Sequence, residues 1–348
     1  MATQDYAASI QGVSIRVTRL DAAGNLLNNP GDSYTTSAFI RVSFTPEYEQ
    51  GDEITEKAAD GTVCVVYQSP NTLKRITMEL AICEPDPELT QLISGGLLLR
   101  KNYGTFSTPD RKSIGWSSPA VGDDPASNGV ALEAWSFAIK AGKKSASLPY
   151  FRWVFPYVKL RQSGDRVIEN GLLANTFEGY GLGNTAFGSG PDERWEFPVA
   201  TERPYSYART AWAPTGRNGF YTWHGELTAS VNNVARTGST ATLTTSAAHG
   251  FAAGDSVTVS GLTNSALNGT YTITTAPTST TFTYTTATTG TIASVSDTGT
   301  SLVGAGSRHV TDFTSQGSTS AYNVPGNQGY NADLPVDFII ASTEDPTV

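Results

Sequence analysis

The residues that could carry out catalysis or bind a cofactor are few and form no recognisable constellation. Of the three histidines, His224 stands in a His-Gly-Glu triplet like the one that opens the zinc-deaminase signature, but no pair of cysteines follows it. The other two, His249 and His309, complete no histidine-based metal cluster. A G-x-S-x-G nucleophile motif is absent. We therefore expect no catalytic residue, no cofactor and no metal site, and the chain is not predicted to be an enzyme.

Two other stretches have the letters of binding motifs and simpler explanations. Gly181–Ala186 matches the dinucleotide fingerprint, but the glycines and proline of Gly188–Pro191 forbid the helix that this motif must open. The acidic residues of Glu84–Glu88 could suggest a calcium loop. The prolines between them leave too little room for the backbone ligands of such a loop, and helix capping explains them better.

The clearest structural signal is a strand followed by a helix, in Leu73–Gly96. Apolar and polar residues alternate from Arg75 to Ile82, as in a half-buried strand. Asp86 is a good N-cap, and Pro87 suits the first helical position. An apolar stripe of leucines and an isoleucine follows, and Gly95-Gly96 supplies the stop. This spacing predicts one short helix beside a sheet.

An acidic stretch, Glu47–Thr62, precedes the strand Val63–Gln68. It has no convincing period, and we predict a long exposed loop that presents a surface to a partner; a solvated loop without a role is the alternative. Its carboxylates are interface candidates: Glu47, Glu49, Asp52, Glu53, Glu56 and Asp60.

The heaviest aromatic run is Pro149–Gln162. Phe151, Trp153 and Phe155 alternate with apolar residues on the opposite face, so the strand should be buried on both sides, with another subunit as the second cover. Pro156 implies a bulge or an edge position. These three aromatic residues are further candidates for a subunit interface.

Composition favours an all-β protein rich in turns, since Gly and Pro are plentiful and charged residues reach only 16%. The net charge of −9 argues against an electrostatic grip on nucleic acid. No signal peptide and no membrane span are expected. Cys64 and Cys83 are interpreted as small buried apolar residues in a reducing cytoplasm, although a disulfide or a reactive thiol is possible.

Composition changes abruptly after Leu227. Between Thr228 and Thr300 there are 23 threonines and only three charged residues, Arg236, Asp255 and Asp297. Short strands separated by turn residues predict a separate small β module. The expected strands are Ala241–Thr245, Ser256–Ser260, Thr270–Thr274 and Thr281–Thr285. We place domains at 1–226 and 227–303, with a C-terminal extension at 304–348.

Two pieces of the chain resemble known families. Ala2–Trp223 resembles the major tail tube protein of long-tailed, siphovirus-like phages. The likeness lies in Gly51–Tyr67, Met78–Gly96 and Arg203–Gly216. The second piece, Ala241–Gly290, resembles a β module fused to phage tail proteins, with HGF, GD-x-V-x-V-x-G, NGTYT and TTFTY in order.

This resemblance implies a mainly β fold: a tail-tube-type β-sandwich or barrel with one short flanking helix, plus a small separate all-β module projecting outward. It implies a virion protein, made in the host cytoplasm, whose hexameric rings stack into the phage tail tube. The partners would be further copies of itself and the tape measure and tail terminator proteins; DNA would pass without specific binding, and no membrane is involved. Glu79 and Arg75 are candidates for the lumen wall, which is expected to be acidic.

Two alternatives remain open at this point. The chain could be another virion component, such as a tail fibre, baseplate or head-decoration protein. It could also be a cell-surface carbohydrate-binding protein, which would predict a signal peptide and usually disulfides.

Overall fold

The structure is a computed structural model. It describes residues 6–29, 31–83, 85–102, 111–122, 129–164, 175–195, 202–214, 219–309 and 339–340. The chain is divided into two compact units. The second contains Trp223–Arg308 and the described residues of Ser189–Glu196, and the first contains the rest. The fold is mainly β with one short α-helix, as predicted.

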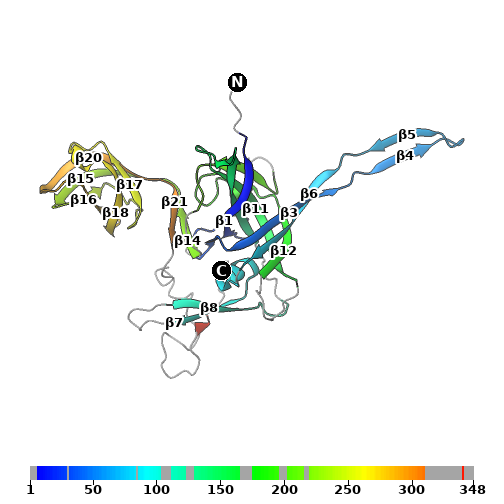
Figure 1. Cartoon of the computed structure of the whole chain (residues 1–348), viewed down its shortest axis with the longest axis horizontal. Helices are drawn as coiled ribbons and strands as arrows, with labels where there is room; N and C mark the ends of the chain where they lie inside the picture. Colours follow the sequence, from blue (N-terminus) through cyan, green and yellow to red (C-terminus); the bar gives the residue numbers. More distant parts are fainter. Residues whose placement is uncertain are drawn as a thin grey trace. The chain divides into compact units, whose positions relative to one another are not determined.

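The first unit is built on one large antiparallel sheet (Figure 1). Its strands are β1 (Ala8–Arg19), β2 (Ser33–Thr36), β3 (Phe39–Glu49), β6 (Thr72–Ile82), β9 (Val130–Lys140), β11 (Tyr150–Ser163) and β12 (Asn175–Leu182), in the spatial order β2-β1-β9-β11-β12-β6-β3. The short strands β10 (Lys143–Lys144), β13 (Ser206–Thr210) and β14 (Gly219–His224) pair with β9, β11 and β2. The described part of β3 pairs with β6 alone and ends the sheet.

The core of this unit lies on one face of the sheet, under the helix. Ile76, Met78 and Leu80 point inward from β6, as their alternation predicts, and Ile15 and Val17 do the same from β1. The helix α1 (Pro87–Ser94) buries Leu89, Leu92 and Ile93 in the same cluster. This buried apolar surface is the main source of the unit's stability.

The helix has the caps that its sequence predicts. The Asp86 carboxylate accepts hydrogen bonds from the backbone N–H groups of Glu88 (3.0 Å) and Leu89 (3.1 Å). Gly95 follows the last turn with φ +68°, and its N–H donates to the Gln91 carbonyl. Capping therefore accounts for Asp86, as the sequence indicates.

The opposite face of the sheet buries an ionic cluster. The Glu133 carboxylate of β9 accepts hydrogen bonds from the guanidinium groups of Arg16 and Arg152, and all three side chains are almost wholly buried. The guanidinium carbons of Arg16 and Arg152 lie 5.3 Å and 5.4 Å from the centroid of the Trp135 ring. Strand β11 thus buries a charged side chain, Arg152, on this face, which its aromatic sequence did not predict.

A bulge in β11 explains why Phe155 lies on a different face of the strand than the sequence predicts. Its register against β9 shifts between Phe155 and Val158, around Pro156, as the proline predicts. The shift places Phe155, Val158 and Leu160 in the same core cluster. Strict alternation had placed Phe155 on the opposite face from the other two.

Two smaller sheets complete the first unit. Strands β4 (Glu53–Lys57) and β5 (Val63–Gln68) form a two-stranded sheet, described below. The prolines between Arg100 and Gly129 predict a long irregular connection, but this stretch contains β8 (Arg111–Ser117), which pairs with β7 (Leu97–Asn102). The sequence of Val336–Ile340 predicts a strand, of which the structure describes β22 (Ile339–Ile340), paired with β7.

The second unit contains a closed barrel of six strands. They are β15 (Leu227–Thr237), β16 (Thr240–Thr245), β17 (Ser256–Ser260), β18 (Gly269–Thr278), β19 (Thr281–Thr285) and β20 (Ile292–Val303). The four predicted segments correspond to β16, β17, β18 and β19, with β18 longer than predicted, whereas the two longest strands, β15 and β20, were not predicted. The barrel has its own apolar core, which includes Val234, Leu243, Phe282 and Tyr284. A short strand, β21 (Gly306–His309), follows it.

Candidate assembly surfaces

The polar face of the sheet at β3, β6, β12 and β11 is the first candidate surface. Strand pairing aligns its outward side chains in rows across the strands. One row contains Ser43, Glu79, Glu178 and Arg161, and the next contains Thr45, Thr77, Tyr180 and Lys159. Arg75 lies on the same face, so both predicted lumen residues, Glu79 and Arg75, are on one surface.

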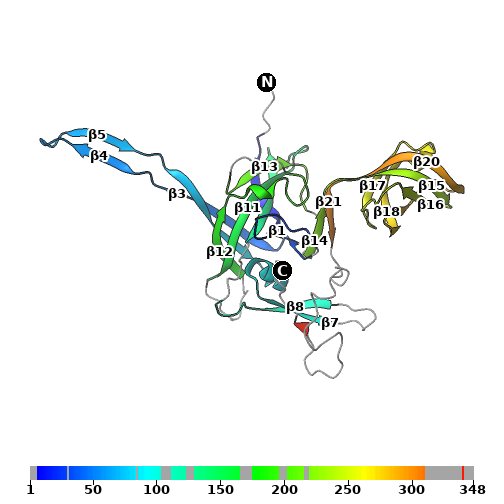
Figure 2. The same ribbon diagram turned by 180° about the vertical axis from the view of Figure 1, so that it is seen from behind.

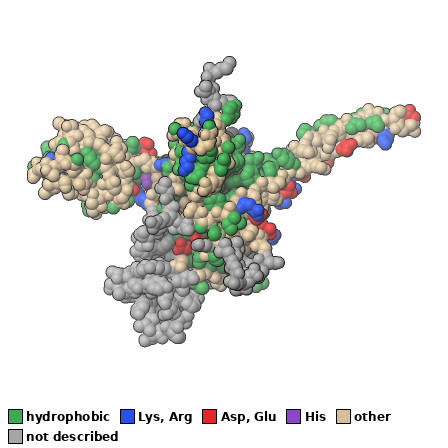
Figure 3. All heavy atoms as spheres, in the orientation of Figure 1, with side chains coloured by type: hydrophobic (Ala, Val, Ile, Leu, Met, Phe, Trp, Pro, Cys, Tyr) green, Lys and Arg blue, Asp and Glu red, His purple; other side chains and the backbone are tan. Residues whose placement is uncertain are grey.

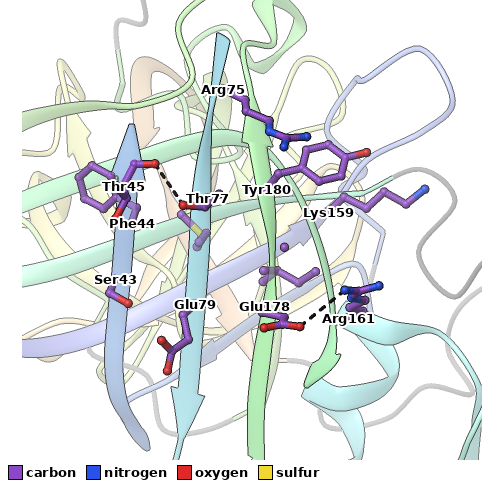
Figure 4. A pocket seen from close by; sticks show the side chains of 13 residues that line it. Ser43, Phe44, Thr45, Arg75, Thr77, Glu79, Lys159, Arg161, Glu178 and Tyr180 are labelled. Atoms are coloured by element: carbon purple, nitrogen blue, oxygen red, sulfur yellow. Dashed lines mark hydrogen bonds and ion pairs between the residues drawn. The ribbon is translucent and has the colours of Figure 1, made fainter. Parts of the chain in front are cut away.

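This face is hollowed, with a volume of about 870 Å³ (Figure 4). Close approach of β12 to its neighbour helps to shape it. A Cβ on Gly179 would lie 1.9 Å from the Lys159 carbonyl oxygen, so only glycine fits there. Gly181, in the apparent dinucleotide motif, likewise packs against Ile76, and a 3₁₀ turn, η1 (Thr185–Phe187), follows where that motif would need a helix.

The charges on this face are paired within the chain. Arg41 binds Glu79, and the Arg161 guanidinium lies 3.6 Å from the Glu178 carboxylate. The Arg75 guanidinium donates to Glu47 at 2.5 Å and lies over the Tyr180 ring. The hydrogen bond from Arg75 lowers the pKa of the Glu47 carboxyl below its ordinary value and raises the pKa of Arg75.

The lumen wall is expected to be acidic, but the face that carries the two predicted lumen residues has mixed charge. The hollow is lined by three basic side chains, Arg75, Lys159 and Arg161, and by two acidic ones, Glu79 and Glu178. Glu178 and its basic partners were missed because their alignment depends on strand register, which alternation within one strand does not reveal. The surface is therefore one of paired, mixed charges.

The second candidate surface is an extended hairpin, here called the arm, made of β4 and β5. The prediction of a loop for Glu47–Thr62 is wrong: β3 runs on to Glu49, and β4 follows at Glu53. Figures 1 and 2 show the arm continuing from β3 and β6 and extending away from the sheet. The strand β5 was predicted with these bounds, Val63–Gln68. The strand β4 and its pairing with β5 were missed because β4 buries neither face, so its sequence has no period-2 burial pattern.

The tip of the arm carries a signal that could have identified it. Asp60-Gly61 is a typical hairpin dipeptide between strands. The backbone N–H of Ala58 donates to the Thr62 carbonyl, and Gly61 has φ +86°. The Asp60 carboxylate accepts hydrogen bonds from the Thr62 N–H and hydroxyl, which lower its pKa.

The arm exposes apolar side chains on both strands (Figure 3). Ile54 is 52% exposed, Val65 52%, Val66 62% and Tyr67 55%. A two-stranded hairpin is marginally stable alone in water, and such apolar exposure is costly. The arm therefore has the character of a segment that is covered by a partner.

The six predicted acidic residues are divided between the arm and its base. Glu47 and Glu49 end β3, Asp52 lies in the link, Glu53 and Glu56 lie on β4, and Asp60 lies at the tip. Apart from Glu47 and Asp60, described above, these carboxylates are exposed and face solvent. They give the arm an acidic character.

The aromatic candidates on β11 lie within their own unit. Phe155 is 1% exposed and Phe151 9% exposed, so neither is available to a second copy, contrary to the prediction. The chain covers this strand itself, through its core and the β13 segment. Trp153 is partly exposed, and its ring lies 4.6 Å from Tyr207 and 5.9 Å from Phe44.

Both cysteines are free thiols, and Cys64 is exposed on the arm rather than buried as predicted. Within the described residues no group of three or more His, Cys, Asp or Glu side chains is placed to hold a metal ion. A search of the same residues finds no helix with the length and apolarity to span a bilayer.

Neither a comparison with models of known protein families nor one with curated protein sequences gives a match for this chain. The exposed acidic arm and the hollowed face of paired charges are the features of the described residues on which a function can be based.

Proposed function

We propose that the chain is a structural subunit of the tail tube of a long-tailed phage, with hexameric rings stacked around a channel for DNA. The observation that carries this proposal is the arm. A hairpin that exposes Ile54, Val65 and Tyr67 to water is explained if another copy of the chain covers it on assembly.

The outer edge of β3, which pairs with no further strand among the described residues, supports the same proposal. An unpaired strand edge is a template for pairing with another chain. In a closed ring of identical copies, each copy pairs its edge strand with the neighbouring copy, so that no strand edge stays unpaired. Pro46 in β3 is compatible with an edge strand, since proline within sheets occurs at edges or at bulges.

In this proposal the hollowed face lines the channel, and its paired charges suit the passage of DNA. DNA is retained by unpaired Lys and Arg side chains that neutralise phosphates and release counterions. On this face Arg41, Arg75 and Arg161 are each engaged by a carboxylate of the same chain. Phosphates sliding past would compete with these carboxylates, which keeps binding weak.

The test is to remove the arm without disturbing the sheet. Glu49 and Thr72 are paired residues of β3 and β6, so an Asn-Gly turn can replace residues 50–71 and close the hairpin there. We expect a folded protein that no longer forms rings or tubes by light scattering. Assembly equal to that of the unmodified chain would contradict the proposal.

The second unit favours a second candidate function, that of another virion component, such as a tail fibre, baseplate or head-decoration protein. Paired strands align uncharged threonines on its outer face, as in the row Thr242, Thr283 and Thr275. A protein with only this role would remain a monomer or a small oligomer when purified. The arm-deletion experiment separates the two candidates, because only tube formation depends on the arm.

A further inference from the structure

The proposed function leaves open which surface receives the arm, and a second patch on the first unit has the matching chemistry. Strand pairing aligns Ile10 of β1, Phe137 of β9 and Tyr150 of β11. Paired residues point to the same face of a sheet, so the three side chains form one apolar row. The Phe137 and Tyr150 rings lie 5.7 Å apart, and Ile10 is 50% exposed.

Lysines border this row. Ala141 and Gly142 both have positive φ and form the two-residue turn between β9 and β10, which brings Lys140 and Lys143 into register. The Lys144 ammonium lies 3.5 Å from the centroid of the Phe137 ring. All three lysines are exposed. Lys144 pairs with Ile139 and lies on the face of Phe137, whereas Lys140 and Lys143 lie on the other face, at the turn. We call Ile10, Phe137, Tyr150 and Lys144 the lysine patch.

One face of the arm has the complementary pattern. Ile54 pairs with Tyr67, and Glu56 pairs with Val65 two residues further along. Because side chains repeat every two residues, these four lie on the same face. It has an apolar centre of Ile54, Val65 and Tyr67 with the carboxylate of Glu56 beside it, and Glu53 and Asp52 add negative charge to the arm.

We propose that the lysine patch of one copy is the docking site for the arm of a second copy. The apolar rows pack together, and the Glu56 carboxylate pairs with the Lys144 ammonium. This inference rests on the proposed function and adds to it the identity of the receiving surface. The opposite charges of arm and patch on a single chain favour a second copy as the occupant.

The arm does not fold back on the patch of its own chain in this structure, which favours a contact between copies. β4 and β5 pair only with each other in the described chain, and Figures 1 and 2 show them directed away from the sheet. A contact between two different surfaces of identical chains is heterologous and builds rings or open-ended assemblies. A contact between the arm of one copy and the patch of another is therefore compatible with rings that stack into a tube.

A crosslinking experiment tests the contact directly in the assembled full-length protein. A maleimide–succinimide reagent joins the exposed thiol of Cys64 to nearby lysines. Because Cys64 lies on the face of the arm opposite Val65 and Tyr67, the spacer must be long enough to pass the edge of the two-stranded hairpin. A Cys83→Ser background leaves a single reactive thiol. In tubes made from mixed ¹⁴N- and ¹⁵N-labelled chains, we expect links from Cys64 to Lys140, Lys143 or Lys144 between chains of different label. Links only to other lysines, or only within one chain, would overturn the inference.

Charge reversal provides the independent test. Lys144→Glu and Glu56→Lys should each raise the concentration needed for assembly by about tenfold or more, and the double variant should recover most of that loss. Arg203→Glu, at an exposed basic residue outside the patch, is the matched control and should assemble normally. Circular dichroism of each single variant should show an unchanged fold, because both side chains are exposed.

The outcomes separate this inference from the proposed function. If the unmodified chain forms tubes and Lys144→Glu does so at the same concentration, the docking site is wrong while the tube proposal stands. Impaired single variants without recovery in the double variant would equally exclude the Glu56–Lys144 pair. If the unmodified chain forms no rings or tubes, both proposals fall.

Discussion

Glu79 and Glu178 lie directly opposite each other on β6 and β12, and each carboxylate is held by an arginine on its outer side. Like charges at paired positions destabilise a sheet unless they are compensated. Arg41 and Arg161 supply that compensation. The arrangement keeps four charged side chains on one surface with little net charge, which suits a wall that DNA passes without binding.

This relationship predicts the effect of removing the carboxylates. Glu79→Gln with Glu178→Gln releases Arg41 and Arg161 and makes the face strongly basic. We expect assembled tubes of this variant to bind short duplex DNA about tenfold more tightly than the unmodified tubes, with affinity falling as salt is raised. Fluorescence anisotropy at several salt concentrations measures this.

The matched control for that experiment keeps the charge constant. Glu178→Gln combined with Arg161→Gln removes one charge of each sign, so DNA binding should stay at the level of the unmodified tubes. Tight DNA binding by unmodified tubes, or no change in the basic variant, would contradict a channel lined by this face.

The buried ionic cluster predicts a large effect on stability. Glu133→Gln leaves the guanidinium groups of Arg16 and Arg152 buried without their carboxylate. Breaking a buried ion pair in this way costs about 3–5 kcal/mol of unfolding free energy. Urea denaturation followed by tryptophan fluorescence measures the loss, since Trp135 lies beside both arginines. Glu178→Gln, at an exposed pair, should cost less than about 1 kcal/mol; an equal loss in both variants would refute this account.

Much of the fold could be predicted from local pattern. The alternation in β6 and the caps of α1 are set by residues close together in sequence, and the predictions for Arg75–Ile82 and Asp86–Gly95 are confirmed. Four of the six barrel strands in the second unit, β16 to β19, were predicted because their turns are marked by glycine and asparagine, whereas β15 and β20 were not predicted. These signals act over a few residues, so one sequence is enough to reveal them.

The candidate surfaces were harder to predict, for physical reasons. The arm buries neither face, so burial periodicity is absent, and only Asp60-Gly61 marks its turn. The bulge at Pro156 shifts the phase of β11, which moves Phe155 into the core. The partners of Glu79 come from strands far apart in sequence, and a register between them cannot be read from alternation.

The base of the arm should respond to pH. The ordinary pKa of Glu47 is 4.5, and the hydrogen bond from Arg75 lowers it in the folded chain. A lowered carboxyl pKa contributes stability that is present above the ordinary value and is lost as pH falls through the folded value. The protection of the β4 and β5 amides, measured as the exchange rate relative to the intrinsic rate at each pH, should therefore decrease as pH falls below the ordinary pKa of 4.5. In Glu47→Gln this pH dependence should be weaker; an identical profile would show that the pair does not anchor the arm.

The second unit should be removable. Leu227 and Val303 are paired residues of β15 and β20, so the strands that enter and leave the barrel lie side by side. Replacing Thr228–Thr300 with a short Gly/Ser linker should leave a folded first unit that still forms tubes, with a smaller outer diameter. Failure to form rings would mean that the barrel is part of the tube wall.

The most direct test of the central claim is cryo-electron microscopy of the purified full-length protein across a range of concentrations. The account predicts six-fold rings stacked into tubes, with the arm of each copy covered by another copy and with Glu79 and Glu178 facing the channel. Monodisperse monomers or globular trimers at all concentrations, or tubes in which that face points away from the channel, would contradict it.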